Sequence, residues 1–490
     1  MEILLNGVQE VISYIFSHLA YINLLFAFVI VFFQRKDPKS VWAWLLILYF
    51  IPVLGFVFYL LAGTDIYKAK LFRTKEIEDK LSDAIRRQES SIRNRELAES
   101  YPEMADYADL VLYNLQTAGA VLSDDNEVEI IVNGKEKFRR LFEDLENAKQ
   151  SIHIQYYIIK DDEIFASMAE ILKRKATEGV EVRVLFDAMG CRTMGQKKWQ
   201  ELETAGIETA EFFPAFFGRL QLRINYRNHR KIVVVDGQTS YVGGFNVARE
   251  YVGLDKKFGY WRDTHMRITG TAVQSLQARF ILDWNYANRK HKIPFEPYLF
   301  EKPEKQGMGC PVQIISSGPD TQDKSIRDTY LRMIHKANKS IYIQTPYFIP
   351  DEAIFSALLI AARSGIEVNV MIPCKPDHPF VYWATYSYVG ELVLAGANCY
   401  TYNNGFIHAK GMIVDEEVLC YGTANMDIRS FGLNFEVNAV IYDKKKAAEM
   451  AGYFREDLKV SQKITRNGYL SRPLWQRFKE QVCRLFSPVL

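Results

Sequence analysis

Cysteine is scarce in this sequence and widely spaced. The six cysteines among 490 residues stand no closer than 21 positions apart. This spacing excludes zinc knuckles, Cys-x-x-Cys redox pairs and compact disulfide frameworks, all of which need cysteines close together in the chain. A large excess of positive charge is also missing, because the formal net charge is +2. Proteins that bind nucleic acids usually carry a strongly basic domain, so we expect no nucleic-acid partner.

Two long stretches near the N-terminus contain no charged residue. Residues 11–33 and 41–63 lack Asp, Glu, Lys and Arg over 23 positions each, and a short polar segment separates them. A helix needs roughly 20 apolar residues to cross the hydrocarbon core of a bilayer. The first stretch does not fit a signal peptide, because no Lys or Arg precedes it and no small-residue cleavage site follows it. We therefore predict a two-helix transmembrane hairpin in residues 1–66.

Glycine and proline are absent from residues 67–101, which are rich in Lys, Glu, Arg, Gln and Ala. This composition favours a helix, and its charges are typical of a solvated face. We predict that residues 67–120 form a charged helical connector between the hairpin and the rest of the chain.

From about Glu127 onwards, short apolar runs of strand length alternate with helical patterns, which predicts an α/β fold. The pattern occurs twice. Residues 340–348 (SIYIQTPYF) resemble residues 151–157 (SIHIQYY) and lie 189 positions later, and residues 367–372 (EVNVMI) resemble residues 181–186 (EVRVLF) and lie 186 positions later. Repeated offsets of this size indicate an internal duplication.

The duplication predicts two α/β domains, residues 121–295 and residues 310–465, with a linker near residues 289–309. Packed face to face, two such domains would share one active site. Residues 466–490 are predicted to form a C-terminal amphipathic helix. Its apolar residues recur at helical spacing and basic residues flank them: Leu474, Trp475, Phe478, Val482 and Leu485, with Arg477, Lys479 and Arg484.

The most specific pattern is a motif that occurs once in each copy. A histidine is followed at +2 by lysine, at +7 by aspartate and at +17 by asparagine: His229, Lys231, Asp236 and Asn246 in the first copy, and His408, Lys410, Asp415 and Asn425 in the second. Side chains two apart on a strand point to the same face. Each His and Lys should therefore share a face, and each Asp should point to the opposite face.

These residue types suit chemistry on a phosphodiester, whose negative charge repels anionic nucleophiles. A neutral imidazole can attack phosphorus, and an imidazolium can donate a proton near neutral pH. Lysines on the same face would bind the non-bridging oxygens and stabilise the charge that builds up in the transition state. The asparagine amides can donate hydrogen bonds to the same oxygens. A site of this kind needs no metal and no other cofactor.

The arrangement resembles the signature of the phospholipase D superfamily, His-x-Lys-x4-Asp with a downstream Gly and Asn. The order of the chain, over essentially its whole length, resembles bacterial cardiolipin synthases of the two-motif, membrane-anchored type. The implied fold is a transmembrane hairpin followed by two duplicated phospholipase D-like α/β domains that share one active site. The implied location is the cell membrane, with the catalytic domains on the cytoplasmic face.

The resemblance also implies a reaction. Two phosphatidylglycerol molecules become cardiolipin and glycerol through an intermediate in which the phosphatidyl group is bound to a histidine. It favours His229 as the nucleophile and His408 as the acid and then the base. The expected partners are phosphatidylglycerol and anionic membrane lipid.

The expected catalytic set is His229, Lys231, Asp236, His408, Lys410 and Asp415, in which the aspartates orient the motif without contacting the phosphate. The expected substrate-binding set is Asn246, Asn425, Asp263 and Glu436. Glu436 lies eleven residues after Asn425, where the superfamily carries an acid that orients a histidine. Asp263, seventeen residues after Asn246, is the matching acid in the first copy.

Other functions are compatible with the same motif. A hydrolytic phospholipase D, a transferase that uses serine or another alcohol, and a phosphodiesterase nuclease share the chemistry, although the hairpin and the balanced charge argue against the nuclease. A non-catalytic membrane scaffold would have broken motifs, and both motifs are intact.

Overall fold

The computed structural model describes most of the chain that follows residue 100 and selected parts before it. The described residues are several positions between 21 and 31, and residues 38–50, 55, 85–94, 96, 99, 101–214, 226–295, 298, 309–321 and 323–487. By internal contacts the chain divides into two compact units. One comprises residues 1–68 with 215–226, and the other comprises residues 69–214 with 227–490.

In the N-terminal unit, the apolar helix α2 (Pro38–Phe50) contacts the segment that precedes it. Ile30 and Leu48 are buried in one small cluster, and Asn23 Nδ2 donates a hydrogen bond to Leu48 O at 3.2 Å. Across the described positions, no helix is both long enough and apolar enough to cross a membrane. The predicted spans, residues 11–33 and 41–63, lie mostly outside those positions.

The larger unit is a mixed α/β fold, as predicted, and its first half forms one sheet in the order β4-β3-β2-β6-β7-β8-β1. Its strands are β1 (Ser123–Asn133), β2 (Ser151–Tyr156), β3 (Glu181–Asp187), β4 (Glu208–Phe212), β5 (Arg227–Asn228), β6 (Ile232–Val235), β7 (Thr239–Gly243) and β8 (Trp261–Thr269). Its helices are α7 (Gly134–Glu146), α8 (Glu163–Thr177), α9 (Gln196–Thr204), the 3-10 helix η3 (Arg249–Val252) and α10 (Ala272–Ala287).

The second half repeats this sheet in the order β9-β18-β16-β15-β10-β12-β13-β19. Its strands are β9 (Cys310–Ser317), β10 (Ser340–Gln344), β11 (Phe348–Ile349), β12 (Glu367–Pro373), β13 (Asn398–Tyr402), β14 (Phe406–Ile407), β15 (Gly411–Val414), β16 (Val418–Gly422), β17 (Met426–Asp427), β18 (Asn434–Ile441) and β19 (Ser461–Lys463). Its helices are α11 (Ser325–Lys336), α12 (Glu352–Arg363), α13 (Pro379–Leu394), α14 (Ile428–Gly432), α15 (Lys444–Leu458), α16 (Arg466–Leu470) and α17 (Leu474–Leu485).

Local sequence signals account for where the first helices begin. The Asn133 side chain accepts a hydrogen bond from the Lys135 backbone N–H at 2.8 Å, so α7 starts at Gly134. Asp162 accepts from the backbone N–H groups of the first turn of α8 in the same way. Side chains of this type satisfy N–H groups that have no partner within the helix.

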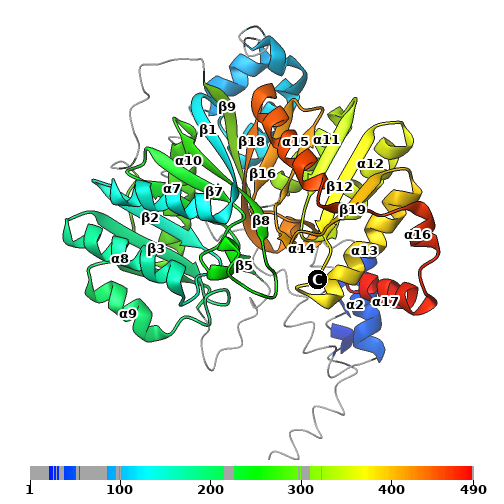
Figure 1. Cartoon of the computed structure of the whole chain (residues 1–490), viewed down its shortest axis with the longest axis horizontal. Helices are drawn as coiled ribbons and strands as arrows, with labels where there is room; N and C mark the ends of the chain where they lie inside the picture. The colour runs from blue at the N-terminus through cyan, green and yellow to red at the C-terminus, as the bar shows by residue number, and fades with distance from the viewer. Residues whose placement is uncertain are drawn as a thin grey trace, which may run out of the picture. The chain divides into compact units, whose positions relative to one another are not determined.

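The two halves are joined through strand β1 into one hydrogen-bonded network (Figure 1). β1 pairs with β8 of its own half and, at its start, with β9 of the second half. Two short parallel pairings also cross between the halves, β5 with β18 and β14 with β8. One hydrophobic cluster contains residues of both sheets, among them Val234, Met266, Ile413 and Val437. The duplicated copies therefore pack as one body.

The end of the predicted connector is part of this body. Helix α6 (Ala108–Ala118) follows the 3-10 helix η2 (Pro102–Tyr107) and buries Leu110 and Val111 in the core of the second half. Asn114, fully buried, donates to Gln313 on β9 at 3.1 Å and accepts from Thr329 on α11 at 2.7 Å. The last turns before residue 120 thus pack against the second half rather than projecting as a solvated helix.

Candidate active site

Each motif histidine directly follows a two-residue strand, β5 or β14, that pairs with a strand of the opposite half. The backbone N–H of His229 donates to Phe435 O at 2.9 Å, and that of His408 donates to Arg262 O at 2.6 Å. Each chain then continues into a strand of its own sheet, β6 or β15, in which every residue is buried. The position of each histidine is therefore set by both halves at once.

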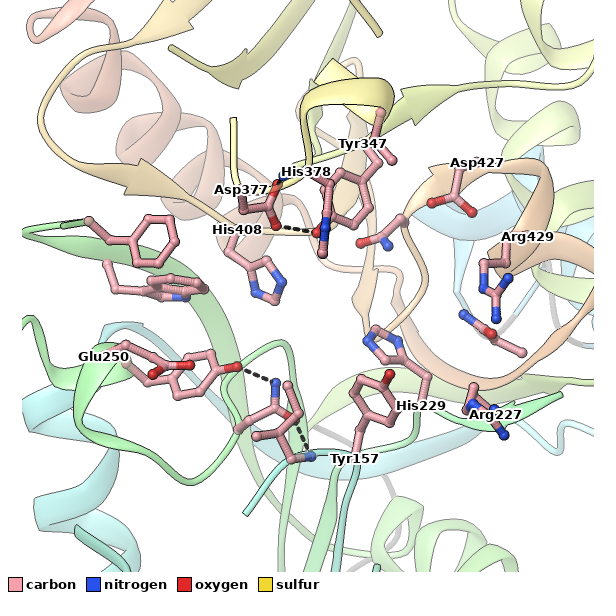
Figure 2. A pocket seen from close by; sticks show the side chains of 18 of the residues that line it. Tyr157, Arg227, His229, Glu250, Tyr347, Asp377, His378, His408, Asp427 and Arg429 are labelled. Atoms are coloured by element: carbon pink, nitrogen blue, oxygen red, sulfur yellow. Dashed lines mark hydrogen bonds between the residues drawn. The ribbon is translucent and has the colours of Figure 1, made fainter. Parts of the chain in front are cut away.

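The two histidines face a single cavity of about 500 Å³ from opposite sides (Figure 2). Both residues are at least nine-tenths buried. The cavity lining also contains both motif asparagines and a set of charged and aromatic side chains from both halves: Tyr157, Arg227, Glu250, Tyr251, Trp261, Tyr347, Asp377, His378, Asp427 and Arg429. The histidine and the asparagine of both motifs therefore border the same cavity.

Each histidine is oriented by an acid from the other half. His229 Nδ1 lies 3.0 Å from both carboxylate oxygens of Glu436, and His408 Nδ1 lies 2.6 Å from Asp263 Oδ2. An ionised carboxylate only accepts hydrogen bonds, so each acid favours the tautomer with the proton on Nδ1, and at His408 Lys410 Nζ lies 2.8 Å from the same nitrogen. The lone pair is then on Nε2, the nitrogen left to face the cavity.

Glu436 and Asp263 contact the histidines, in keeping with the orienting role that the resemblance implies for them. Both are fully buried, and neither lines the cavity. Their place in the substrate-binding set stays a prediction.

Burial keeps both histidines neutral at pH 7. It lowers the pKa of His229, against the opposing effect of the Glu436 carboxylate. It lowers the pKa of His408 to about 4, helped by the Lys410 ammonium and opposed by Asp263. A neutral imidazole with a free Nε2 is the form that a nucleophile or a general base requires.

The motif lysines lie beneath the histidines, on the same strand face as predicted. Lys231 Nζ donates to His229 O at 2.7 Å, and Lys410 Nζ donates to His408 O at 2.5 Å. Both lysines are buried, and neither lines the cavity. Burial lowers the pKa of Lys231 to about 7 and that of Lys410 to about 8. An anion placed in the cavity would favour their charged forms.

The motif aspartates lie away from the cavity. Asp236 accepts hydrogen bonds from three successive backbone N–H groups at the start of β2, at 2.7–2.9 Å. Asp415 does the same at the start of β10, at 2.8 Å in each case. Their place in the catalytic set stays a prediction. The orienting role given to them agrees with the observed bonds, since each ties its motif strand to the neighbouring strand.

The two motif asparagines are in different states. Asn246 is fully engaged, because its Oδ1 accepts from the Ile158 N–H at 3.1 Å and its Nδ2 donates to the Tyr251 hydroxyl at 2.8 Å. Asn425 also lines the cavity, but its buried Oδ1 has no hydrogen-bond partner among the described residues. Asn425 thus keeps an unused hydrogen-bond acceptor beside the cavity.

Two buried ion pairs support the site and were not predicted. Arg230 Nη1 donates to both oxygens of Asp283 at 2.7 Å within the first half. Arg262 Nε donates to Asp457 at 2.9 Å, and this pair connects the two halves. The final glutamine of each repeated strand, Gln155 or Gln344, bonds the same aspartates at 2.7 and 2.8 Å. The shared SIxIQ pattern was the available signal, because a glutamine at the same place in two buried strands needs a polar partner.

The charged side chains of the cavity are unevenly placed, which the sequence did not reveal. Arg227, Arg429 and the acid Asp427 lie on the side of His229, whereas Asp377, bonded to the Tyr347 hydroxyl, lies on the side of His408 (Figure 2). Aromatic rings flank both histidines, with Tyr157 4.9 Å from His229 between ring centroids. Within the described ranges, no group of three or more His, Cys, Asp or Glu is placed to hold a metal ion.

The turn after the motif strand provides a test of the Asp263 contact. A Cβ on Gly244 would lie 2.0 Å from Asp263 Oδ1. We expect Gly244→Ala to push this carboxylate away from His408 and to lower turnover by about 10²-fold, since small misplacements in a reacting site cost rates of that order. The control is Gly452→Ala, where an added Cβ has no neighbour within 4 Å. Wild-type turnover in a folded Gly244→Ala enzyme would contradict the expectation.

Two models of known protein families match this chain. Residues 141–284 and 330–458, more than half of the chain together, match the family model described as cardiolipin synthase, PLD-like domain. Residues 22–63 match the model described as phospholipase D-nuclease N-terminal.

Two curated relatives cover nearly the full length. The major cardiolipin synthase ClsA of Bacillus subtilis (strain 168) is 48% identical over 483 residues, which are 98% of this chain and 100% of that protein. A cardiolipin synthase of Staphylococcus aureus (strain Mu50) is 45% identical over 491 residues, 100% of this chain and 99% of that protein.

Among solved structures, phosphatidylserine synthase from Haemophilus influenzae Rd KW20 matches with a TM-score of 0.58. The match covers 74% of this chain and 95% of that chain at 14% identity, so it concerns the fold alone. The family model and the full-length relatives together establish that this chain belongs to the cardiolipin synthases of the phospholipase D superfamily.

Proposed function

We propose that this protein transfers a phosphatidyl group from one phosphatidylglycerol to another and produces cardiolipin and glycerol. The observation that carries the proposal is the pair of neutral histidines in one cavity, each held by an acid of the opposite half. Two bases on opposite sides of one phosphate suit a two-step transfer. One attacks the phosphorus, and the other donates a proton to the leaving group and then accepts one from the acceptor.

In the first step, His229 Nε2 attacks the phosphorus of the donor lipid. The N–P bond forms as the bond from phosphorus to the glycerol oxygen breaks, and His408 donates its proton to that oxygen. The donor phosphate brings a negative charge next to His408, which raises the pKa of His408 from its low value in the empty cavity. Glu436 stabilises the positive charge that develops on the His229 ring.

In the second step, a terminal hydroxyl of the second phosphatidylglycerol attacks the same phosphorus. His408, now neutral, takes the hydroxyl proton, and the N–P bond breaks to release His229. Lys231 and Lys410, which lie outside the cavity lining, stabilise the charge on the non-bridging oxygens electrostatically, and the N–H groups of the Asn425 amide donate to these oxygens. Arg227 and Arg429 supply further positive charge on the His229 side of the cavity.

The products decide between transfer and hydrolysis. Purified protein incubated with phosphatidylglycerol should release glycerol and cardiolipin in equal amounts, measured by chromatography of the lipids and an enzymatic glycerol assay. Phosphatidic acid as the sole lipid product would replace the proposal with a hydrolytic phospholipase D. A product formed only when another alcohol is added would replace phosphatidylglycerol as the acceptor.

Activity should persist in an excess of chelator. The groups that we assign to the phosphate charge are Lys231, Lys410 and the Asn425 amide, and none of them depends on a bound ion. The measurement is cardiolipin formation with and without EDTA after dialysis. Loss of activity that one particular divalent ion restores would refute this assignment.

We further propose that residues 11–33 and 41–63 form a transmembrane hairpin with the catalytic body on the cytoplasmic side. Three observations support the hairpin. The segment matches the N-terminal family model, Ile30 and Leu48 pack together, and α2 exposes large apolar side chains such as Trp42 and Tyr49. An anchor places enzyme and both lipid substrates in one membrane, which raises their effective concentration.

Removal of residues 1–63 should separate anchoring from catalysis. We expect the truncated protein to fold, because the catalytic unit begins only after residue 68. It should turn over detergent-dispersed phosphatidylglycerol at a rate close to that of the full chain and work at least 10-fold more slowly on vesicles. Failure of the truncated protein to fold, seen by circular dichroism, would show that the hairpin belongs to the catalytic core.

A further inference from the structure

Helix α17 carries its apolar face on the outside of the catalytic unit. Leu474, Trp475, Phe478 and Leu485 have relative exposures between 57% and 80%. Their spacing puts them on one side of the helix, within an arc of about 100° at 100° per residue. A helix on the surface of a water-soluble body normally turns such a face inwards.

The inward face of α17 is polar, and ion pairs fix its orientation. Glu480 is fully buried and accepts from Arg472 Nε at 2.8 Å. Arg484 pairs with Glu391 on α13 and lies over the Tyr388 ring at 4.3 Å. The buried residues of α17 are Glu480 and Cys483, so the apolar side chains at 474, 475, 478 and 485 are left on the outer face.

The exposed face adjoins helix α13, which leads to the cavity. α17 lies beside α13 (Figure 1), and Lys479 Nζ lies 5.3 Å from the Trp383 ring of α13 and 5.5 Å from the Trp475 ring. At the start of α13, Phe380 is 60% exposed, and its neighbours His378 and Val381 line the cavity. We call Phe380, Leu474, Trp475, Phe478 and Leu485 together the α13–α17 platform.

The C-terminal segment that carries most of the platform is mainly basic. From Lys459 to Leu490 the sequence has seven Lys or Arg residues and one acid, Glu480. That acid is buried against Arg472 and contributes nothing to the outer surface. Lys479 and the exposed Arg477 flank the apolar side chains on α17. Apolar side chains flanked by basic residues bind an anionic lipid surface, with the rings at the headgroup level and the bases on the phosphates.

We propose that the α13–α17 platform is an interfacial membrane-binding surface, separate from the N-terminal hairpin, which holds the mouth of the cavity against an anionic leaflet. A second copy of the chain fits the platform less well, because two like-charged surfaces would face each other. The proposal concerns contact with lipid and does not depend on which lipid the enzyme consumes.

A site-specific fluorophore tests the contact in the full chain. Phe478→Cys is labelled with an environment-sensitive dye in a Cys374→Ser background, since the other five cysteines are buried. The protein is reconstituted in vesicles of phosphatidylserine and brominated phosphatidylcholine. Phosphatidylserine supplies the negative charge without being the proposed substrate. The matched control is a label at Ile360→Cys on α12, a position as exposed as Trp475, at 64% for both.

The brominated lipid should quench the label at position 478 several-fold more than the label at position 360. The hairpin holds both proteins on the same vesicles, so any difference reports contact of the platform alone. Replacing Lys479 with Glu, or omitting phosphatidylserine, should reduce the quenching at 478. Equal and weak quenching at both positions would overturn the proposal. Protection of position 478 from aqueous iodide without quenching by lipid would also overturn it, because a protein surface would then cover the platform.

Discussion

Replacing either His229 or His408 with alanine should lower the rate of cardiolipin formation by about 10³-fold or more. Each side chain faces the same cavity, and each supplies a step that the other cannot supply while it performs its own. The effects of the two replacements on the activation free energy should not add. The double variant should be little slower than the worse single variant, since both residues serve one transition state.

The measurement is the initial rate of cardiolipin formation in single and double variants, with folding checked by thermal denaturation. His335→Ala is the control, because this histidine is exposed on α11 and far in sequence from either motif. A single variant that keeps more than a tenth of the wild-type rate would remove that histidine from the mechanism.

The same variants identify the nucleophile. With His408→Ala and a donor lipid whose leaving group needs no protonation, His229 should still become phosphatidylated, and mass spectrometry should find the adduct there. His229→Ala should trap nothing. An adduct on His408 instead would exchange the two roles. No adduct on either residue, under conditions where the wild-type enzyme turns over, would indicate direct attack by the acceptor alcohol.

The sequence predicted the local part of this site because that part depends on strand periodicity. His and Lys two apart had to share a face, and Asp236 at an odd spacing had to leave it, and the hydrogen bonds of Asp236 agree. The duplication predicted that the second motif would repeat the first, and Asp415 bonds the start of β10 just as Asp236 bonds the start of β2.

Strand periodicity could not predict how the two halves pack against each other. Which acid meets which histidine depends on the two-residue pairings of β5 with β18 and of β14 with β8. Strands so short leave no periodic signal. The pattern of α17 showed similarly that one face is apolar, but only Glu480 and its buried partner Arg472 show which way that face turns.

The acids behind the histidines should be almost as important as the histidines. We expect Glu436→Gln and Asp263→Asn each to lower the rate by about 10²–10⁴-fold. A carboxylate can only accept from Nδ1–H, whereas an amide can also donate, so the variant ring can adopt the tautomer with its proton on Nε2. That tautomer has no lone pair facing the cavity. Melting temperatures separate this effect from unfolding, and Glu436→Asp, which keeps a carboxylate, should recover part of the rate.

The pH profiles should distinguish the two acids. Each carboxylate raises the pKa of its histidine against the effect of burial, so its removal lowers that pKa further. If His229 attacks as the neutral base, Glu436→Gln should move the acidic limb of the profile to lower pH, because the ring stays neutral further down. If His408 donates the proton, Asp263→Asn should move the alkaline limb to lower pH, because the imidazolium is lost sooner as pH rises. Acidification should therefore restore part of the rate in Asp263→Asn. If Glu436→Gln moved the alkaline limb and Asp263→Asn moved the acidic limb, the roles of the two histidines would be exchanged. Unchanged profiles with unchanged rates would show that both acids are structural residues only.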